Sequence, residues 1–565
     1  MARTAQTKNR RNARRAAPAK GRRKRLAPAG PWAALTLVVL LAVLALRLAV
    51  IALEPFPVHF DEAQYWAYGQ ALDWGYFSKP PLVAWLVRAV TEVGGDSLFA
   101  LRLVSPLAHA LTAWLIFLTG RRLWDGRSGF WAGLGYTAAP GVGLSAMILS
   151  SDPVMMAFWA AALYAMVRAA ESEGRLWWGV LGVLIGAGLL AKYTMLAFAL
   201  GALGYGLFAA RERNWAGTAI AAAAALLVVS PNLFWNAANG FVTLAHVAGD
   251  ADPGRGYFHL VEAAEFVGAQ FAVIGPVFMA AILLALKNRS AWRDDWGMRL
   301  VAWQTVPLLA AMTGLALVTR AQANWAAPAY IGGALLAARW LVTAGGAPAL
   351  RAQLGVGIAA SLALWTVAGL YAGQAEELTI RLDPFRQMRI SQPYCELVLG
   401  TMDEEGSEVL LSDNRRRLSE CMFYGGLGWD AVAIWNPDGR PGNHHELVAA
   451  LRPGDQRQML LVVERGAAAL AHHFEAAREV DSGFLETHVD RSVAFSIWAV
   501  QPAQPFAQGA GRLSKNAAMP SAASAVSHWS ARAVAVIAMV ASSIGRARRN
   551  SSAFEAAAAP GATPR

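Results

Sequence analysis

The sequence predicts a polytopic α-helical membrane protein with a small extracytoplasmic α/β domain near its C-terminus. The chain is 56% hydrophobic and its mean hydropathy is +0.35, both above the usage of ordinary soluble domains. Apolar runs recur along it, each near the roughly 20 residues that a helix needs to cross the hydrocarbon core of a bilayer. After about residue 374 the apolar runs shorten to the length of β-strands, which indicates a second kind of structure.

The first 31 residues form a basic arm. They contain eleven lysine and arginine residues and no acidic ones, so the net charge of +12 comes almost entirely from this segment. A polybasic arm before a first span is typical of a cytoplasmic N-terminus and of contact with anionic lipid headgroups. We favour that interpretation over nucleic-acid binding. Because the arm and its span are long for a cleaved signal peptide, we expect both to be retained as an anchor.

We predict about eleven transmembrane helices within residues 32–373. Their approximate ranges are 32–53, 97–119, 129–149, 153–169, 176–191, 193–210, 215–231, 264–286, 298–319, 325–342 and 353–373. With the N-terminus inside, nearly every basic loop falls on the cytoplasmic side, as the positive-inside rule requires. The same alternation places loops 54–96 and 232–263 outside. Residues 81–94 are too short to span, and we expect an amphipathic helix along the interface there.

Residues 374–501 are predicted to form the extracytoplasmic α/β domain. The expected strands are 409–411, 431–434, 459–463 and 493–498, and the helix-like stretches between them lie around 414–424, 443–452 and 466–478. The chain's two cysteines, Cys395 and Cys421, are both here, and the sequence leaves a disulfide and two free buried thiols as alternatives. Residues 502–565 are rich in Ala, Ser, Pro and Gly, so we expect them to be disordered.

Polar residues that are unusual in a membrane protein gather on the predicted outer face. Asp61 and Glu62 follow the first span, and Lys79 precedes two prolines, which hold it in an extended backbone. The alternation brings further polar residues to the same face, namely Asp152, Lys192, Asn232, His246, His259, Arg320 and Asn324. Because charges near hydrocarbon are costly without partners or a function, this convergence predicts a single active site.

Each candidate also has a structural interpretation. Asp61 and Glu62 could complement the dipole at a helix start, or Asp61 could be a catalytic base while Glu62 supports it or a metal. Lys79 could extend toward lipid headgroups, or it could hold the phosphate of a lipid substrate. Asp152 taken alone is a helix cap, and Lys192 taken alone is an interface anchor. We favour the functional interpretation of Asp61 and Lys79 because they share one loop and one face.

The first outer loop resembles that of the membrane glycosyltransferases of family 39, which include dolichyl-phosphate-mannose protein mannosyltransferases and bacterial aminoarabinose lipid A transferases. The resemblance is carried by the segments Asp61–Trp66, Leu72–Phe77 and Lys79–Pro81, with supporting matches at Ser151–Pro153, Leu190–Thr194, Ser230–Trp235 and Ala323–Tyr330. It covers roughly residues 32–373 and, weakly, the stretch around 413–424.

The resemblance implies a GT-C fold and a sugar donor carried on a polyprenyl phosphate. Asp61 matches the family's catalytic aspartate, and Lys79 matches the basic residue that relatives place beside the lipid phosphate. Some relatives have a carboxylate that helps to bind a metal where this chain has Ser78, so a divalent metal is possible but not assigned. The expected substrate-binding residues are Glu62, Tyr76, Lys79, Asp152, Lys192, Arg320 and Asn324.

The predicted function is inverting transfer of a sugar from a polyprenyl phosphate to a hydroxyl of a lipid, glycan or protein, on the outer face of a bacterial inner membrane. Asp61 would accept the hydroxyl proton, and Lys79 would neutralise the departing phosphate. A transporter or flippase would instead place ionisable residues at mid-membrane and show gapped spans in corresponding halves. A third alternative is a sensor or scaffold that binds through its α/β domain. The sequence does not identify the sugar or the acceptor.

Overall fold

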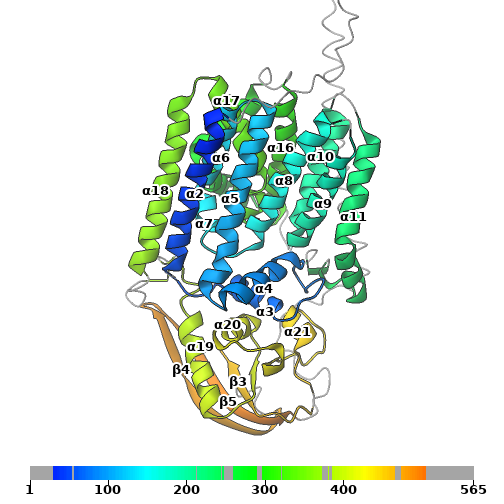
Figure 1. The fold of residues 1–565 in the computed structure, drawn as a ribbon. Helices are drawn as coiled ribbons and strands as arrows, with labels where there is room; N and C mark the ends of the chain where they lie inside the picture. The colour runs from blue at the N-terminus through cyan, green and yellow to red at the C-terminus, as the bar shows by residue number, and fades with distance from the viewer. Residues whose placement is uncertain are drawn as a thin grey trace, which may run out of the picture.

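In the computed structural model the chain has two main layers, a bundle of long helices and a sheet domain beneath it (Figure 1). The structure describes residues 30–503 except 54–55, 173, 211–212, 244, 247–258, 289–294, 320, 372–378, 381–382, 384, 453 and 465–472. Most of the predicted basic arm, the predicted tail beyond residue 503 and the candidate Arg320 therefore lie outside the described residues.

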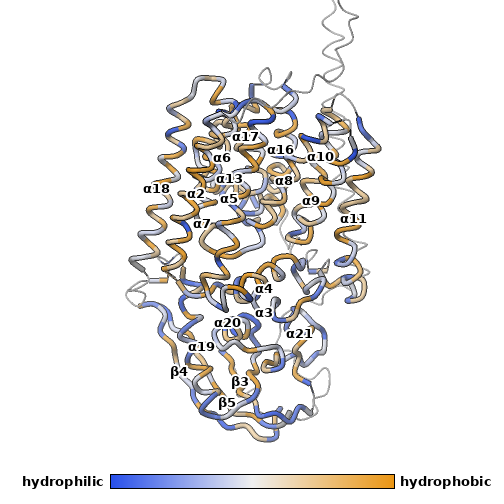
Figure 2. Tube along the Cα trace, viewed as in Figure 1, coloured by the Kyte–Doolittle hydropathy of each residue, from blue (hydrophilic) through white to orange (hydrophobic). Residues whose placement is uncertain are grey.

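The bundle accounts for the apolar half of the sequence, and Figure 2 shows hydrophobic residues along its helices. Its helices are α2 (Gly30–Ala52), α5 (Leu98–Leu123), α6 (Gly126–Thr137), α7 (Pro140–Ser145), α8 (Ser151–Glu171), α9 (Leu176–Ala191), α10 (Leu196–Phe208), α11 (Trp215–Ala238), α13 (Leu260–Ile274), α14 (Pro276–Lys287), α16 (Trp296–Val318), α17 (Ala329–Thr343) and α18 (Ala347–Tyr371). Among the described residues, six of these helices are long and apolar enough to cross a membrane, or seven if the bent pair α13–α14 counts as one. A many-helix membrane bundle is thus confirmed, whereas the predicted number of eleven spans is not.

Two of the predicted spans are broken, and proline marks both breaks. The predicted span 129–149 is divided into α6 and α7 just before Pro140, which occupies the first position of α7. The predicted span 264–286 bends by 109° between α13 and α14, at Gly275 with φ +94°. Gln353 fills this bend, because its amide donates to the Ile274 carbonyl at 2.8 Å and accepts from the Phe278 amide at 3.2 Å.

The second layer is a five-stranded sheet with helices on the side that faces the bundle (Figure 1). Its elements are α19 (Ser391–Glu404), β1 (Val409–Ser412), α20 (Arg415–Gly425), β2 (Val432–Ile434), α21 (His444–Val448), β3 (Met459–Val463), β4 (Phe474–His488) and β5 (Arg491–Ala503). The strand order is β2-β1-β3-β5-β4, with β1 parallel to β2 and β3, and with β5 antiparallel to β3 and β4. Cys395 of α19 and Cys421 of α20 form a disulfide, which decides between the two alternatives that the sequence left open.

One predicted element in this layer is wrong. The sequence predicts a helix over about 466–478. Residues 466–472 lie outside the described residues, but from Phe474 on the chain forms β4, which pairs with β5 along its length. The residues at its start, Phe-Glu-Ala-Ala-Arg-Glu, include good helix formers and lack the alternation of a half-buried strand. Most of β4 is exposed, so pairing with β5, rather than burial of an apolar face, determines its conformation.

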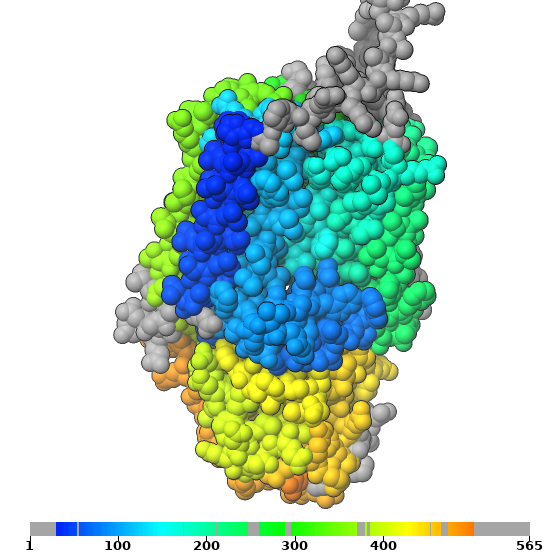
Figure 3. Space-filling model, viewed as in Figure 1, coloured from blue at the N-terminus to red at the C-terminus, as the bar shows by residue number. Residues whose placement is uncertain are grey.

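Two short helices lie between the layers, α3 (Phe60–Gly69) and α4 (Leu82–Gly94). Helix α4 occupies the predicted 81–94 segment and buries one face through Val83, Ala84 and Val87. Almost all of α3 is buried, because it packs on α4 and on α20, and Glu62 joins it to Arg102 of α5. Figure 3 shows this segment in blue as a band between the bundle and the sheet domain.

Candidate active site

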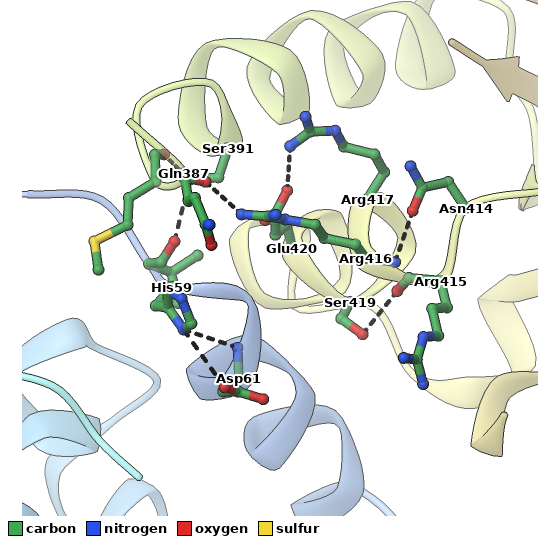
Figure 4. A network of polar contacts seen from close by, with 12 residues as sticks. His59, Asp61, Gln387, Ser391, Asn414, Arg415, Arg416, Arg417, Ser419 and Glu420 are labelled. Atoms are coloured by element: carbon green, nitrogen blue, oxygen red, sulfur yellow. Dashed lines mark hydrogen bonds and ion pairs between the residues drawn. The ribbon is translucent and has the colours of Figure 1, made fainter. Parts of the chain in front are cut away.

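Helix α3 begins with a capping box that determines the direction of Asp61. The Nδ1 atom of His59 accepts a hydrogen bond from the Asp61 amide at 3.2 Å, and the Glu62 carboxylate accepts one from the His59 amide at 2.9 Å. Figure 4 shows His59 and Asp61 together below the arginine-rich start of α20. Asp61 thus occupies the first turn of α3, and its side chain is 40% exposed. A carboxylate in this position is held in place and remains accessible.

Glu62 has the opposite surroundings, and its predicted role in substrate binding is corrected here. Its side chain is fully buried between Arg102, which donates to both carboxylate oxygens at 3.1 and 3.0 Å, and the amide of Leu149 at 2.9 Å. With the His59 amide, these donors use both oxygens of Glu62. Arg102 also donates to two backbone carbonyls in the loop before α3. Glu62 therefore fixes α3 to α5 and leaves no oxygen for a substrate.

Lys79 lies in a tight turn beside Asp61. The backbones of Tyr76 and Lys79 exchange hydrogen bonds of 3.0 and 3.3 Å, and the two following prolines hold the exit from the turn. The Nζ atom of Lys79 is 3.9 Å from Oδ1 of Asp61 and 5.7 Å from the centroid of the Tyr65 ring. Tyr65, and then Asp61 and Asp152, raise the pKa of Lys79 although burial opposes them. The lysine is therefore charged at neutral pH.

Tyr76 supports this turn, and its predicted contact with substrate is also corrected. Its ring is 1% exposed and stacks on Tyr68 with 4.4 Å between centroids and 4° between planes. Its hydroxyl donates to the Tyr68 carbonyl at 3.0 Å. The side chain of Tyr76 is thus fully used in joining the Lys79 turn to α3.

A second polar cluster forms around the carboxylate of Asp152, where three candidate residues from distant parts of the sequence meet. Asp152 in the first turn of α8 accepts from Nζ of Lys192 at 2.6 Å and from the amide of Asn324 at 3.1 Å. Lys192 follows the end of α9, and Asn324 lies in the short helix η2 (Ala323–Ala326). The N-cap of α8 is Ser150, and the hydrogen bonds of the Asp152 carboxylate to described residues go to Lys192 and Asn324 rather than to the start of the helix. The influence of Asp152 on Lys79 places the two within electrostatic reach of each other.

The end of α11 holds the loop that precedes Lys79. Asn232 accepts from the Tyr193 hydroxyl at 2.8 Å and donates to the Trp74 carbonyl at 2.7 Å. Trp235, one turn away, donates its indole N–H to Asp73 at 2.6 Å. Because Tyr193 follows Lys192, these hydrogen bonds connect the surroundings of Asp152 with the loop that precedes Lys79.

Sequence reasoning missed three residues of this site. His59 was a recognisable N-cap, because it stands three residues before Glu62 in a capping-box pattern. Arg102 had a stronger signal, because an arginine inside an apolar span requires a partner. Arg415 begins a run of three arginines at the start of α20, but nothing local places α20 over α3. Within the described ranges, no group of three or more His, Cys, Asp or Glu residues could hold a metal ion.

Comparisons with known proteins find relatives by sequence. The family described as dolichyl-phosphate-mannose-protein mannosyltransferase matches residues 78–235. The chain is 30% identical over 428 residues to the lipid A galacturonosyltransferase RgtD of Rhizobium johnstonii, a match that spans 75% of this chain and 89% of that relative. It is 31% identical over 283 residues to an undecaprenyl phosphate-alpha-4-amino-4-deoxy-L-arabinose arabinosyl transferase of Pseudomonas aeruginosa, spanning 44% of this chain and 50% of the relative.

The solved structures show the same fold. The crystal structure of ArnT from Cupriavidus metallidurans bound to undecaprenyl phosphate superposes with a TM-score of 0.53 at 14% identity, covering 84% of this chain and 98% of that one. The apo form of the same protein gives a TM-score of 0.53 at 12% identity. At these identities the likeness establishes the shared membrane fold, and the predicted fold type is confirmed at that level.

Proposed function

The chain belongs to the ArnT-like membrane glycosyltransferases of family 39, and on that premise we propose that it transfers a sugar from a polyprenyl phosphate to a hydroxyl group of an envelope lipid such as lipid A. The relative from Rhizobium johnstonii is named as a lipid A transferase, and the one from Pseudomonas aeruginosa is named for an undecaprenyl phosphate donor. One observation carries the proposal. An accessible carboxylate, Asp61, lies 3.9 Å from the ammonium of Lys79 at the junction of the two layers.

Asp61 would act as the general base. The acceptor hydroxyl would attack the anomeric carbon of the donor while its proton passes to the Asp61 carboxylate. The bond between the anomeric carbon and the phosphate oxygen would break, and its electron pair would leave with the lipid phosphate. One displacement of this kind inverts the anomeric centre. The capping box supports this role, because it directs Asp61 out of the protein while Glu62 remains in the core.

Lys79 would neutralise the departing phosphate. Its raised pKa keeps the ammonium protonated, so a full positive charge would stand where negative charge develops in the transition state. Lys192, which Asp152 holds in place, would supply a second cation for the phosphate. Asn324 donates to the same Asp152 carboxylate. Arg320 stays a prediction, because it lies outside the described residues.

The arrangement of the layers fits a donor that never leaves the bilayer. We propose a cytoplasmic N-terminus, with residues 32–373 as the catalytic bundle and residues 374–501 as an extracytoplasmic domain that covers the site. The polyprenyl tail would lie along the bundle, and the acceptor would enter where Asp61 is exposed. A bacterial inner membrane is the location expected for such a protein.

The test is the variant Asp61→Asn, which keeps the shape of the side chain and removes the base. Sugar transfer and release of free polyprenyl phosphate from a labelled donor should both fall by about 100-fold or more. The matched control is Glu92→Gln, an exposed carboxylate on α4 that pairs with Arg88. Both variants should unfold at the wild-type temperature in detergent. Near-normal transfer by Asp61→Asn would show that another group is the base.

A further inference from the structure

Three consecutive arginines begin α20 on the face of the sheet domain that covers α3. Arg416 pairs with Glu420 at 3.1 Å, and Arg417 pairs with Glu420 at 2.6 Å and with Glu464 at 2.8 Å. For Arg415, no ion pair or side-chain hydrogen bond is found within the part of the chain that the structure describes. Figure 4 shows its side chain extending away from Glu420, toward the side of α3. Two arginines of the run therefore hold the domain together. Arg415 acts electrostatically on Glu446 without an ion-pair contact to it, so its guanidinium is available for a ligand.

Arg415 lies beside the proposed catalytic residues. Its guanidinium carbon is 5.7 Å from the centroid of the Phe60 ring, and Phe60 immediately precedes Asp61. Burial raises the pKa of Tyr68, and both Lys79 and Arg415 oppose that shift electrostatically. Both cations therefore lie within electrostatic reach of the same Tyr68 hydroxyl, one from the membrane loop and one from the sheet domain.

A second polar group at this place has no partner. The Nδ1 atom of His444 is buried and makes no hydrogen bond to any described residue, and His444 as a whole is 4% exposed. The imidazole meets the Tyr68 ring edge-on at 4.7 Å and the Tyr76 ring at 5.1 Å. Burial lowers the pKa of His444 to about 3, so the ring is neutral and can donate or accept one hydrogen bond. The guanidinium of Arg415 thus acts electrostatically on Tyr68, and the unpaired Nδ1 of His444 belongs to a ring that contacts both Tyr68 and Tyr76.

We propose that Arg415 binds a carboxylate on the transferred sugar, so that the preferred donor is a polyprenyl phosphate-linked hexuronic acid. This inference rests on the proposed function and names its substrate class. A planar guanidinium binds a carboxylate through two parallel hydrogen bonds, whereas an ammonium such as that of Lys79 serves a phosphate as a point charge. A uronosyl phosphate carries two anions, the phosphate on C1 and the carboxylate on C5, and Lys79 and Arg415 are two separate cations that both act on Tyr68.

The same arginine would discriminate against other sugars. A neutral hexose would leave the guanidinium of Arg415 without its anionic partner, and a cationic amino sugar would be repelled by it. The relative that this chain spans over 89% of its length is named as a galacturonosyltransferase, and the sugar in that name carries a carboxylate. The amino-sugar relatives match over a smaller share of their length, 50% for the first of them.

The test compares two donors that differ only at C6, a polyprenyl phosphate hexuronic acid and the matching hexose. The full-length chain is assayed in detergent with Arg415→Gln, with Arg415→Lys as the conservative variant, and with Arg440→Gln as a control on an exposed arginine of the same domain. Arg415→Gln should lower kcat/KM for the uronosyl donor by roughly 10- to 100-fold, the value of a charged hydrogen bond, and leave the hexosyl donor unchanged. Arg415→Lys should restore part of the loss, and Arg440→Gln should show none.

Three results would overturn the inference. The wild-type chain could prefer the hexosyl donor, or Arg415→Gln could reduce turnover of both donors equally. The loss could also vanish when the acceptor lipid lacks its phosphate groups, which would assign Arg415 to an acceptor phosphate instead. If the wild-type chain transfers neither sugar from any polyprenyl phosphate, the proposed function itself is wrong. This outcome is distinct from the other three.

Discussion

Asp61 and Glu62 are adjacent in the sequence, but their side chains have different surroundings because they point in different directions from α3. Asp61 is 40% exposed and lies 3.9 Å from the Lys79 ammonium, whereas Glu62 is fully buried and accepts two hydrogen bonds from Arg102. Two neighbouring positions on a helix point about 100° apart, so one faces the junction between the layers and the other faces α5. The proposed base therefore depends on its neighbour for position.

Replacing Glu62 by Ala should be strongly destabilising. The change leaves Arg102 charged and buried without its acidic partner, which costs about 3–5 kcal/mol. The temperature of unfolding in detergent should fall clearly, whereas Glu92→Ala on exposed α4 should shift it little, because surface ion pairs contribute about 0–1 kcal/mol. An unchanged unfolding temperature for Glu62→Ala would mean that the Glu62–Arg102 pair does not hold α3.

At the scale of elements, the apolar pattern predicted where the bundle helices lie in the sequence. It did not predict which of them are broken. Periodicity cannot show whether Gly275 and Pro276 bend a span by 109°, because the bend depends on Gln353 from another helix. The proximity of Lys79 to Asp61 followed from their shared loop. The alternation of spans predicted only that Asp152 and Lys192 lie on the same face, and their ion pair comes from the packing of α8 against α9. No local sequence pattern predicts that Arg415 lies beside α3, because this contact depends on how the sheet domain packs on α3.

The disulfide between α19 and α20 supports a prediction at this scale. Cys395 and Cys421 are 26 residues apart, and closing a loop of this size restricts the unfolded chain. Replacing both by Ala should destabilise the sheet domain by about 2–4 kcal/mol. A reducing agent should lower the unfolding temperature of the wild-type protein and leave that of the double variant unchanged. Equal sensitivity of both proteins to reduction would count against a stabilising disulfide.

At the scale of the whole molecule, the sheet domain and the bundle meet on α3. The Val58 amide donates to the Tyr424 hydroxyl at 3.0 Å, and the Trp429 indole donates to the Ala67 carbonyl at 3.0 Å. The ring of Phe423 packs edge-on against Trp66. These contacts hold both ends of α3, so the domain is part of the framework that positions Asp61.

Tyr424→Phe should therefore make the start of α3 less rigid, although Tyr424 is not itself a proposed catalytic residue. The buried Val58 amide loses its acceptor, at a cost of about 1–3 kcal/mol. Hydrogen exchange of the peptide that contains Val58 should become faster, and transfer should fall although no proposed catalytic group has changed. The matched control is Arg478→Gln, which removes an exposed ion pair with Glu405 in the same domain. Unchanged exchange at Val58 would indicate that the domain does not hold the start of α3.

The pairing of Val58 with Tyr424 joins residues 366 positions apart, and this separation has a consequence for biogenesis. The segment with Asp61 leaves the ribosome early, but its hydroxyl partner is made only after the whole bundle has been synthesised. During membrane insertion the sheet domain has not yet been made, so the Val58 amide before α3 lacks its acceptor, the Tyr424 hydroxyl. A chain that terminates before α20 would display the carboxylate and the lysine without the framework around them, so truncated products should be inserted in the membrane yet inactive.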